Sequence, residues 1–227
     1  MCSRYSLTSP PEAVRAYFRH RNEHGYPPRY NIAPTQPVGI VRTAESGYRD
    51  FQVVRWGLIP PWVKDPRTFT TLINARAETA AEKPSFRGAF RHKRCLVPAD
   101  GFYEWTGPVG GKRPHLIRRR DHGLLAFAGL FESWLGADGS EVDTMAILTV
   151  AANATVDTVH DRMPAILPPE QFDAWLDCRN IETKQASAML QPAPVDLLEI
   201  IEVDPRLNNS RNEGPQLQQP VGQSRLL

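Results

Sequence analysis

Cys2 directly follows the initiator methionine, and this position gives it chemistry that an internal cysteine lacks. Cysteine is small enough for aminopeptidase to remove the methionine before it, which would leave a free α-amine and a thiol on adjacent carbons. An α-amine has a pKa of about 7.7–8.0, against about 10.4 for lysine, so roughly a tenth of it is neutral at pH 7 and able to attack a carbonyl. The thiol can then add to the imine and close a thiazolidine ring. The first residues therefore predict a 1,2-aminothiol that captures aldehydes.

Glu104 and His160 are the residues best suited to move protons in such a reaction. Glu104 is flanked by two aromatic residues, and a partly apolar setting raises the pKa of a carboxyl group toward neutrality. A solvated strand face is the other interpretation of Glu104, and the sequence leaves it open. His160 precedes an aspartate and an arginine, so the three residues offer an imidazole, an orienting carboxylate and a phosphate-binding guanidinium. A purely structural histidine is the alternative.

The segment from Trp56 to Trp62 has two tryptophans, two prolines and a glycine, a composition that excludes a regular element. Such a segment can cover one end of a barrel with apolar side chains. It can also serve as an aromatic platform on which bases stack. Both interpretations remain open.

The chain has 227 residues, of which 41% are hydrophobic and 23% charged, a composition typical of a soluble globular domain. No apolar run approaches the roughly 18 residues that a membrane span needs, and we expect no membrane association. Cys2, Cys95 and Cys178 are too few and too scattered for a disulfide framework, and a metal site from Cys2, Cys95 and His160 has no supporting spacing. The formal net charge of +2 does not by itself indicate a nucleic-acid partner.

The 21 prolines predict many irregular connections and short strands. Ser9 to Glu12 has the pattern of a capping box, which predicts a helix with Ser9 as N-cap that runs to about His24. Asp100-Gly101 predicts a tight turn between two strands. Further strands are expected over residues 38–42, 51–56, 115–118, 124–130, 144–152 and 197–203, the first two forming a hairpin. The Gln/Pro-rich residues 214–227 predict a flexible tail.

Six short motifs occur in a fixed order along the chain: Met1-Cys2-x-Arg4-Tyr5, Asn31-x-Ala33-Pro34-Thr35, Trp56-Gly57-Leu58-Ile59-Pro60-x-Trp62, Asn74-Ala75-Arg76-Ala77-Glu78-Thr79, the block from Cys95 to Trp105, and His160-Asp161-Arg162-Met163-Pro164. With these motifs the chain resembles the SOS-response-associated peptidase (SRAP) family. The resemblance implies a single α+β domain over residues 2–213, with a mixed, largely antiparallel, barrel-like sheet and short peripheral helices. It also implies a protein that senses abasic sites in single-stranded DNA and cross-links to them through its N-terminal cysteine.

The resemblance also implies roles for individual residues. Cys2 would be the nucleophile, Asn74 would position its amine and thiol, and Glu104 and His160 would move protons. DNA would be bound by Arg4, Asn31, Pro34, Trp62, Arg76, Trp105 and Arg162. We further expect a cytoplasmic monomer that needs no metal or other cofactor and joins the nucleoid when it acts on DNA. Lyase and self-cleaving peptidase activities are implied as side reactions.

Ser3 departs from the family pattern, which usually has glycine after the cysteine. If that position needs a positive φ or close approach of DNA, serine costs about 1 kcal/mol. Two other functions remain open on the residues alone. One is an N-terminal-nucleophile amidohydrolase such as a glutaminase, in which the Cys2 thiol attacks an amide. The other is a non-catalytic single-strand binding module that stacks bases on Trp56, Trp62 and Trp105.

Overall fold

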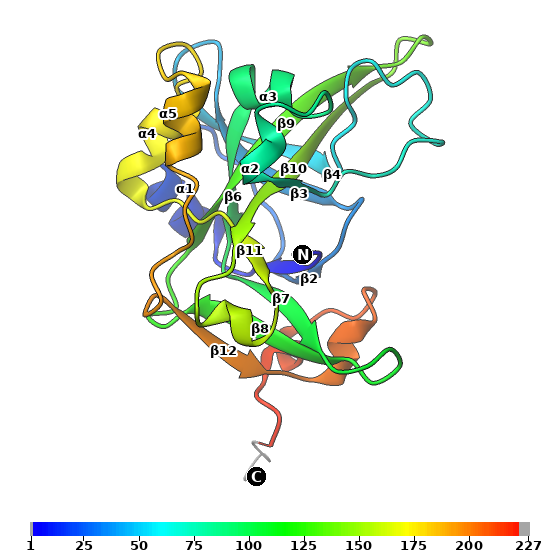
Figure 1. Ribbon diagram of the computed structural model, residues 1–227, viewed down its shortest axis with the longest axis vertical. Coiled ribbons are helices and arrows are strands. Elements are labelled where there is room, and N and C mark those ends of the chain that lie inside the picture. The colour runs from blue at the N-terminus through cyan, green and yellow to red at the C-terminus, as the bar shows by residue number, and fades with distance from the viewer. Residues whose placement is uncertain (1, 223–227) are drawn as a thin grey trace.

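The computed structural model describes residues 2–222, and its larger sheet closes into a barrel (Figure 1). The barrel strands are β3 (Pro37–Thr43), β4 (Arg49–Trp56), β6 (Arg94–Ala99), β9 (Leu125–Leu135) and β10 (Glu141–Ala151). The ring closes because β9 pairs with β6 on one side and with β10 on the other. Among the described strands the two parallel pairings are those of β10 with β4 and with the short β5 (Asn74–Arg76). The predicted mixed, largely antiparallel, barrel-like sheet is therefore confirmed.

Local sequence explains the strands that build this barrel. Strand β10 is buried from Thr144 to Val150, as expected of an almost continuous apolar run with neighbours on both sides. Strands β3 and β4 form the predicted hairpin, and Gly47 in its turn has φ +82°, a conformation that glycine adopts without strain. The strand β11 (Arg162–Pro164) pairs antiparallel with the end of β10.

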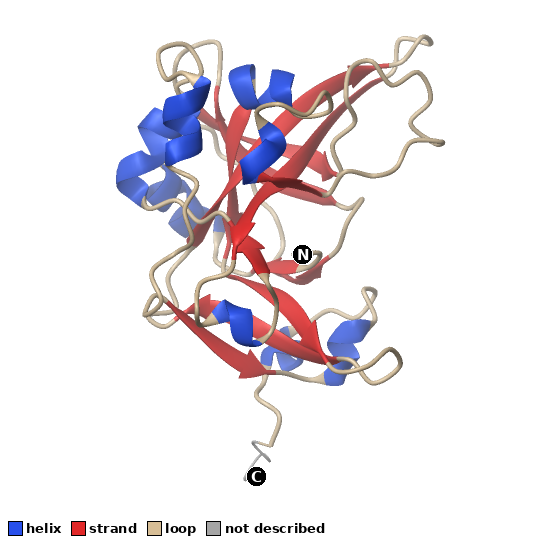
Figure 2. Cartoon of the chain, viewed as in Figure 1, coloured by secondary structure: helices blue, strands red, loops and turns tan. Residues whose placement is uncertain are grey.

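A second, antiparallel sheet lies below the barrel in Figure 1, and Figure 2 shows the strands of both sheets in red. Its strands, in spatial order, are β12 (Leu198–Glu202), β8 (Arg113–Arg119), β7 (Gly101–Thr106), β1 (Tyr5–Leu7) and β2 (Arg29–Ile32). The chain passes from the barrel to this sheet at Asp100, between β6 and β7. The two strands predicted on either side of Asp100-Gly101 are found, but they do not form a hairpin, because each pairs with different neighbours. Gly101 is needed for another reason: a Cβ there would lie 2.8 Å from the carbonyl oxygen of Ile117 on β8.

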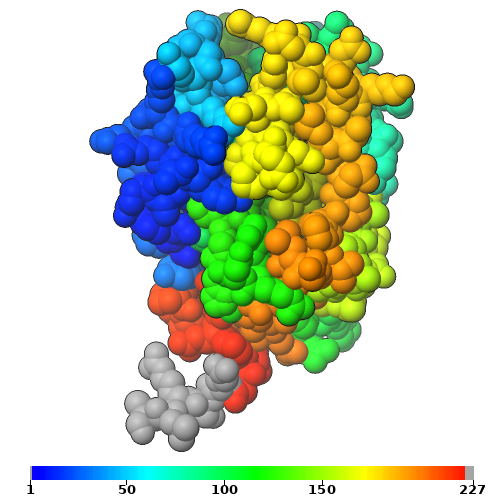
Figure 3. Space-filling model, turned by 90° about the vertical axis from the view of Figure 1, so that its left-hand side faces the viewer, coloured from blue at the N-terminus to red at the C-terminus, as the bar shows by residue number. Residues whose placement is uncertain are grey.

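Short helices cover the outside of the two sheets (Figure 2). The α-helices are α1 (Pro11–Phe18), α2 (Ala77–Ala80), α3 (Arg87–His92), α4 (Phe172–Leu176) and α5 (Thr183–Ala188), and the 3-10 turns are η1 (Val156–Thr158), η2 (Pro169–Gln171), η3 (Pro205–Asn208) and η4 (Pro215–Gln218). Helices α1 and α4 lie side by side on the face shown in Figure 3, where the Phe18 and Phe172 rings stack at 5.5 Å. No helix among residues 2–222 is long and apolar enough to cross a membrane.

The first helix is shorter than predicted, and its start is not a capping box. Helix α1 ends at Phe18 because Arg19 adopts a left-handed conformation with φ +56°. Its N-cap is Pro10, which has no capping side chain. The hydroxyl group of Ser9 instead donates a 2.5 Å hydrogen bond to the Asp100 carboxylate, which also accepts from the Ser9 backbone N–H. Asp100 thus fastens the start of α1 to the junction between the sheets.

Residues 214–222 were predicted as flexible tail, but the structure packs them against the second sheet. Leu217 is buried, and Gln218 Nε2 donates a 2.8 Å hydrogen bond to the Tyr103 hydroxyl group. The Val221 N–H donates to the Glu202 carbonyl, which extends the edge beside β12. The remaining tail residues, 223–227, lie outside the described part of the chain.

Candidate active site

The N-terminal segment continues the pairing of β1 with β7 and so brings Cys2 next to Glu104. Tyr103 N–H donates to the Arg4 carbonyl at 3.0 Å, one step beyond the paired residues of the two strands. Cys2 is fully buried, and its Sγ donates to the Arg4 carbonyl at 3.7 Å. Burial raises the pKa of the Cys2 thiol, and the Glu104 carboxylate raises it further. The thiol is therefore held in its neutral form.

Asn74 reaches the same point from the barrel. It begins strand β5, which is aligned by its parallel pairing with β10. Its Nδ2 donates a 2.7 Å hydrogen bond to the Cys2 carbonyl oxygen. Its Oδ1 is buried and has no hydrogen-bond partner among the described residues. A buried amide oxygen of this kind is well suited to accept a hydrogen bond from an amine.

Glu104 lies at the bottom of the site with only 3% of its surface exposed. Burial raises the pKa of its carboxyl group to about 7. At neutral pH both forms of the side chain are therefore populated, which suits a group that gives and takes a proton. The apolar setting expected from the sequence is found, and the solvated-face interpretation of Glu104 is wrong.

His160 faces Glu104 from the loop between η1 and β11, with 4.0 Å between Nε2 and the Glu104 Oε2. The Arg162 backbone N–H donates to His160 Nδ1 at 2.9 Å, which places the proton of the neutral ring on Nε2. The exposed Asp161 carboxylate lies 2.9 Å from the same Nδ1 and is an acceptor, so it can bind only a ring that is protonated there. Burial lowers the pKa of His160, and the neutral ring bonded to Arg162 is the form we favour.

The four predicted catalytic residues thus meet where the two sheets face one another. Cys2 and Glu104 come from the second sheet, while Asn74 and His160 come from elements at the C-terminal half of β10. These residues are far apart in the sequence, and the pairing of β5 and β11 with one central strand explains their convergence. The arrangement holds an N-terminal backbone and thiol beside an amide, a nearly neutral carboxyl group and an imidazole.

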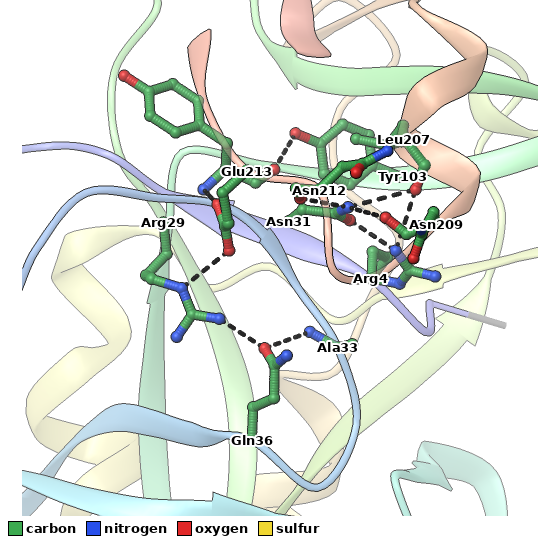
Figure 4. A network of polar contacts seen from close by, with 11 residues as sticks. Arg4, Arg29, Asn31, Ala33, Gln36, Tyr103, Leu207, Asn209, Asn212 and Glu213 are labelled. Atoms are coloured by element: carbon green, nitrogen blue, oxygen red, sulfur yellow. Dashed lines mark hydrogen bonds and ion pairs between the residues drawn. The ribbon is translucent and has the colours of Figure 1, made fainter.

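Arg4 and Asn31 form a buried polar network, shown in Figure 4. Arg4 Nη1 donates to Asn31 Oδ1 at 2.6 Å and to the Leu207 carbonyl at 3.2 Å. Asn31 is fully buried, and its Nδ2 is shared among the carbonyl oxygens of Leu207, Asn209 and Asn212. Asn31, predicted to contact DNA, is therefore fully engaged within the protein in this structure. It holds Arg4 against the C-terminal loop.

Arg4, Trp105 and Asn208 line an open hollow of about 510 Å³ beside the N-terminal segment. The Arg4 guanidinium lies 5.6 Å from the centre of the Trp105 ring, and Trp105 Nε1 donates to Asn208 Oδ1 at 2.7 Å. Lys112 also lines the hollow, at the end of the glycine-rich loop between β7 and β8. Lys112 was missed by the sequence analysis, although a lysine after Gly110-Gly111 is a recognisable signal of an adaptable, cationic loop.

The remaining predicted DNA-binding residues differ in their surroundings. Arg76 is exposed next to Asn74, and Pro34 is half-buried in the loop after β2. Trp62 is 56% exposed in the loop after β4, where Phe69 meets it edge-on at 5.6 Å. Trp56, by contrast, is fully buried and donates to the Ile73 carbonyl, so it belongs to the core and cannot be a stacking platform.

The guanidinium group of Arg162 is bound within the protein instead of facing solvent. Its Nη1 and Nη2 bind the two carboxylate oxygens of Glu78 at 2.6 and 2.8 Å, and Nη2 also donates to the Thr149 carbonyl at 2.6 Å. The hydrogen bonds from Arg162 hold the pKa of Glu78 below its usual range. Glu78 was missed as a site residue, although its place in the Asn74 to Thr79 motif was noticed.

Comparisons with known proteins agree with this architecture. A family model described as SOS response associated peptidase (SRAP) matches residues 1–210. Abasic site processing protein YoqW of Bacillus subtilis (strain 168) is 39% identical over 221 residues, which cover 96% of this chain and 98% of that protein. Abasic site processing protein HMCES of Xenopus tropicalis is 31% identical over 260 residues, covering 95% of this chain and 77% of that protein.

The fold is also similar to a solved structure. The X-ray structure of a protein from Bacteroides thetaiotaomicron superposes with a TM-score of 0.85 at 28% identity and covers 96% of this chain and 99% of that one. On the family model and the curated relatives together, the chain belongs to the SRAP family.

Proposed function

We propose that this protein processes abasic sites in DNA and that, once Met1 has been removed, it captures the opened abasic sugar in single-stranded DNA through Cys2. The names of the relatives support the substrate. The observation that carries the chemistry is the hydrogen bond from Asn74 Nδ2 to the Cys2 carbonyl, beside a carboxyl group with a pKa near 7. It fixes the backbone of the one residue that can present an amine and a thiol to an aldehyde.

The first step joins the Cys2 α-amine to C1′ of the ring-opened sugar. The Oδ1 of Asn74 accepts a hydrogen bond from the amine and directs its lone pair at the carbonyl carbon. The amine adds to the carbonyl carbon, and transfer of one N–H proton to the oxygen gives a carbinolamine. The nitrogen then loses its second proton as the protonated hydroxyl group leaves as water, and a neutral imine remains. Protonated Glu104 supplies a proton to the departing oxygen and regains one from the nitrogen. The Nε2–H of neutral His160 faces the Glu104 carboxyl group, where it can donate a hydrogen bond to the carboxylate while Glu104 is ionised.

The second step closes the ring. The Cys2 sulfur adds to the imine carbon, the imine nitrogen takes the thiol proton, and a thiazolidine forms without further loss of atoms. The buried, neutral thiol transfers its proton as it adds, so a free thiolate is not required. Ring closure competes with β-elimination of the 3′ phosphate from the imine, which is the lyase side reaction. Reversal of the cross-link would use the same groups in the opposite direction, and self-release of Met1 is the peptidase reaction.

The hollow beside the N-terminal segment supplies a place for the flanking nucleotide. Trp105 offers a ring face for base stacking, and Arg4 and Lys112 offer positive charge to phosphates. Arg76 and Trp62 are exposed enough to extend the contact with the DNA strand, and Pro34 is proposed to add an apolar contact. We propose that the protein binds single-stranded DNA through these residues as a monomer and that it needs no metal or other cofactor.

A denaturing gel tests this function. Met-processed protein is incubated with a single-stranded oligonucleotide that has one abasic site, with an intact oligonucleotide and with duplex DNA. We expect a slowly migrating band only with abasic DNA, and none for Cys2→Ala or for protein with a blocked α-amine. No band with abasic DNA, or a band that forms equally with Cys2→Ala, would refute the proposal. Turnover of glutamine by the same preparation would favour the amidohydrolase, and equal, non-covalent binding of abasic and intact DNA would favour the binding module.

A further inference from the structure

The structure assigns Glu78 and Arg162 a positioning role: their ion pair holds the loop that orients His160 toward Glu104. No DNA contact is needed for this role. The inference concerns the site of the proposed function, but its structural part can be tested without any DNA.

The ion pair is built as an internal support. The side chain of Arg162 is only 14% exposed, and its Nε is buried. Its two terminal nitrogens bind Glu78 at 2.6 and 2.8 Å, which is the bidentate geometry that makes guanidinium–carboxylate pairs strong and specific in direction. Most of the hydrogen-bonding capacity of this guanidinium group is therefore used within the protein.

The pair also connects two elements that share the central strand. Glu78 lies in α2, directly after β5, and Arg162 begins β11. Both short strands pair with β10, and Arg162 Nη2 adds a 2.6 Å bond to the Thr149 carbonyl on that strand. The ion pair therefore closes a bridge over the end of β10 and fixes the backbone of Arg162.

The backbone of Arg162 in turn fixes His160. The Arg162 N–H donates to His160 Nδ1 at 2.9 Å and leaves the ring proton on Nε2, which faces Glu104 at 4.0 Å. If the backbone of Arg162 shifts, Nδ1 is free to take a proton and to donate a hydrogen bond to the Asp161 carboxylate, 2.9 Å away. The ring would then present an Nε2 lone pair to Glu104, or become a cation. In neither form would it be the neutral ring whose Nε2–H faces Glu104.

The charged and titratable groups around His160 come from four elements. Glu104 faces it from β7, Cys2 lies beside Glu104 on the N-terminal segment, Asp161 and Arg162 follow it in the chain, and Glu78 is reached through Arg162. Only the Glu78 and Arg162 pair changes in the variants below.

NMR of ¹⁵N-labelled protein measures the tautomer and pKa of His160 directly. Glu78→Gln keeps the shape of the side chain but removes its charge, and Glu78→Asp keeps the charge and serves as the conservative variant. For wild-type protein we expect the Nε2–H tautomer. For Glu78→Gln we expect a mixture of tautomers and a higher pKa of His160, with partial return in Glu78→Asp. An unchanged tautomer and pKa in folded Glu78→Gln would overturn the inference.

Kinetics and salt dependence separate positioning from DNA binding. We expect Glu78→Gln and Arg162→Gln to slow cross-linking at saturating DNA about tenfold and to move its pH profile, because a misplaced proton-transfer group loses part of its catalytic contribution. The control for the rate is Arg91→Gln, a variant of an exposed arginine in α3, which should leave that rate unchanged. The reference for one lost phosphate contact is Arg76→Gln, at the end of β5. It should lower the salt slope of single-strand binding by about 0.7, the effect of one lost phosphate contact.

The salt slopes of single-strand binding also define the result that would contradict the positioning role. If Arg162→Gln lowers the salt slope as much as Arg76→Gln does and leaves the saturating rate unchanged, Arg162 is a phosphate ligand and the positioning role is wrong. Because the NMR measurement needs no DNA, it can succeed even if the proposed cross-linking fails, and the two failures are distinguishable.

Discussion

The side-chain amide of Asn74 donates a 2.7 Å hydrogen bond to the carbonyl oxygen of Cys2, across 72 positions of sequence. This contact joins the barrel to the N-terminal segment of the second sheet. It also leaves the other half of the amide, Oδ1, buried and without a hydrogen-bond partner among the described residues. The reactive terminus is therefore held by the fold instead of extending into solvent.

Replacing Asn74 with aspartate tests this contact. The substitution keeps the shape but exchanges the Nδ2 donor for a carboxylate oxygen beside a carbonyl oxygen, which repels the Cys2 backbone. We expect the cross-linking rate to fall by about 10²-fold or more, as is typical when a reacting group loses its orientation. Single-turnover kinetics would measure it, with Asn180→Asp in the exposed turn after α4 as a control that should have no effect. A rate within twofold of wild type for Asn74→Asp would contradict the assigned role.

Glu104 makes stability depend on pH. Its pKa is raised by burial from the ordinary 4.5 to about 7, so between these values the unfolded chain is ionised while the folded chain remains protonated. Its contribution to stability is therefore complete below pH 4.5, decreases as the pH rises to about 7, and is constant above. Glu104→Gln removes this loss, and its free energy of unfolding relative to wild type should be higher at pH 8 than at pH 4 by roughly 1–3 kcal/mol. Urea unfolding at the two pH values measures the difference, and an equal effect at both would show that the pKa of Glu104 is not raised.

Asn31 should matter for stability and for the position of Arg4. In Asn31→Ala the Arg4 guanidinium loses its 2.6 Å acceptor and three carbonyl oxygens of the C-terminal loop lose their shared donor. We expect a loss of about 2–3 kcal/mol, the usual cost of leaving buried polar groups unsatisfied. Hydrogen exchange should quicken in the backbone of residues 205–213 before it does in the barrel. If hydrogen exchange quickens uniformly over the chain, Asn31 does not specifically hold the C-terminal loop.

Gly101 and Gly88 form a matched pair of glycines. A Cβ at Gly101 would lie 2.8 Å from the Ile117 carbonyl, whereas a Cβ at Gly88, exposed in α3, has no atom within 4 Å. Gly101→Ala should therefore destabilise the protein by about 1–3 kcal/mol through displacement of β7 from β8. Gly88→Ala should stabilise it by about 0.5–1 kcal/mol through helix propensity. Thermal unfolding of both variants measures the contrast, and a loss of similar size in both would mean that the approach of β7 to β8 is not the cause.

The sequence predicts those parts of the fold that depend on local pattern. The apolar run of β10 and the turn at Gly47 give the central strand and the β3–β4 hairpin, since strand burial and turn conformation are set by neighbouring residues. The closure of the barrel through β9 and the parallel pairing of β4 with β10 join distant segments, so no local signal indicates them. The role of Ser9 was mistaken because a distant carboxylate, Asp100, competes for its hydroxyl group.

In the candidate site, too, some features follow from local sequence and others depend on the tertiary structure. Cys2 follows from its position in the chain, and the setting of Glu104 between aromatic residues correctly indicates a raised pKa. The family resemblance implies that Asn31 and Arg162 contact DNA, but the direction of a side chain depends on tertiary structure. The fold turns Asn31 toward the C-terminal loop and Arg162 toward Glu78.

The most direct test of the central claim compares Met-processed wild-type protein with Cys2→Ser, which keeps the α-amine but lacks the thiol. Each is incubated with single-stranded abasic DNA, with and without borohydride, then heated, separated on a denaturing gel and weighed by mass spectrometry. We predict a wild-type adduct that survives heat without borohydride and has the summed mass of protein and DNA less one water. Cys2→Ser should give an adduct only when borohydride traps the imine. An equally heat-stable adduct from Cys2→Ser without borohydride would contradict the thiazolidine mechanism.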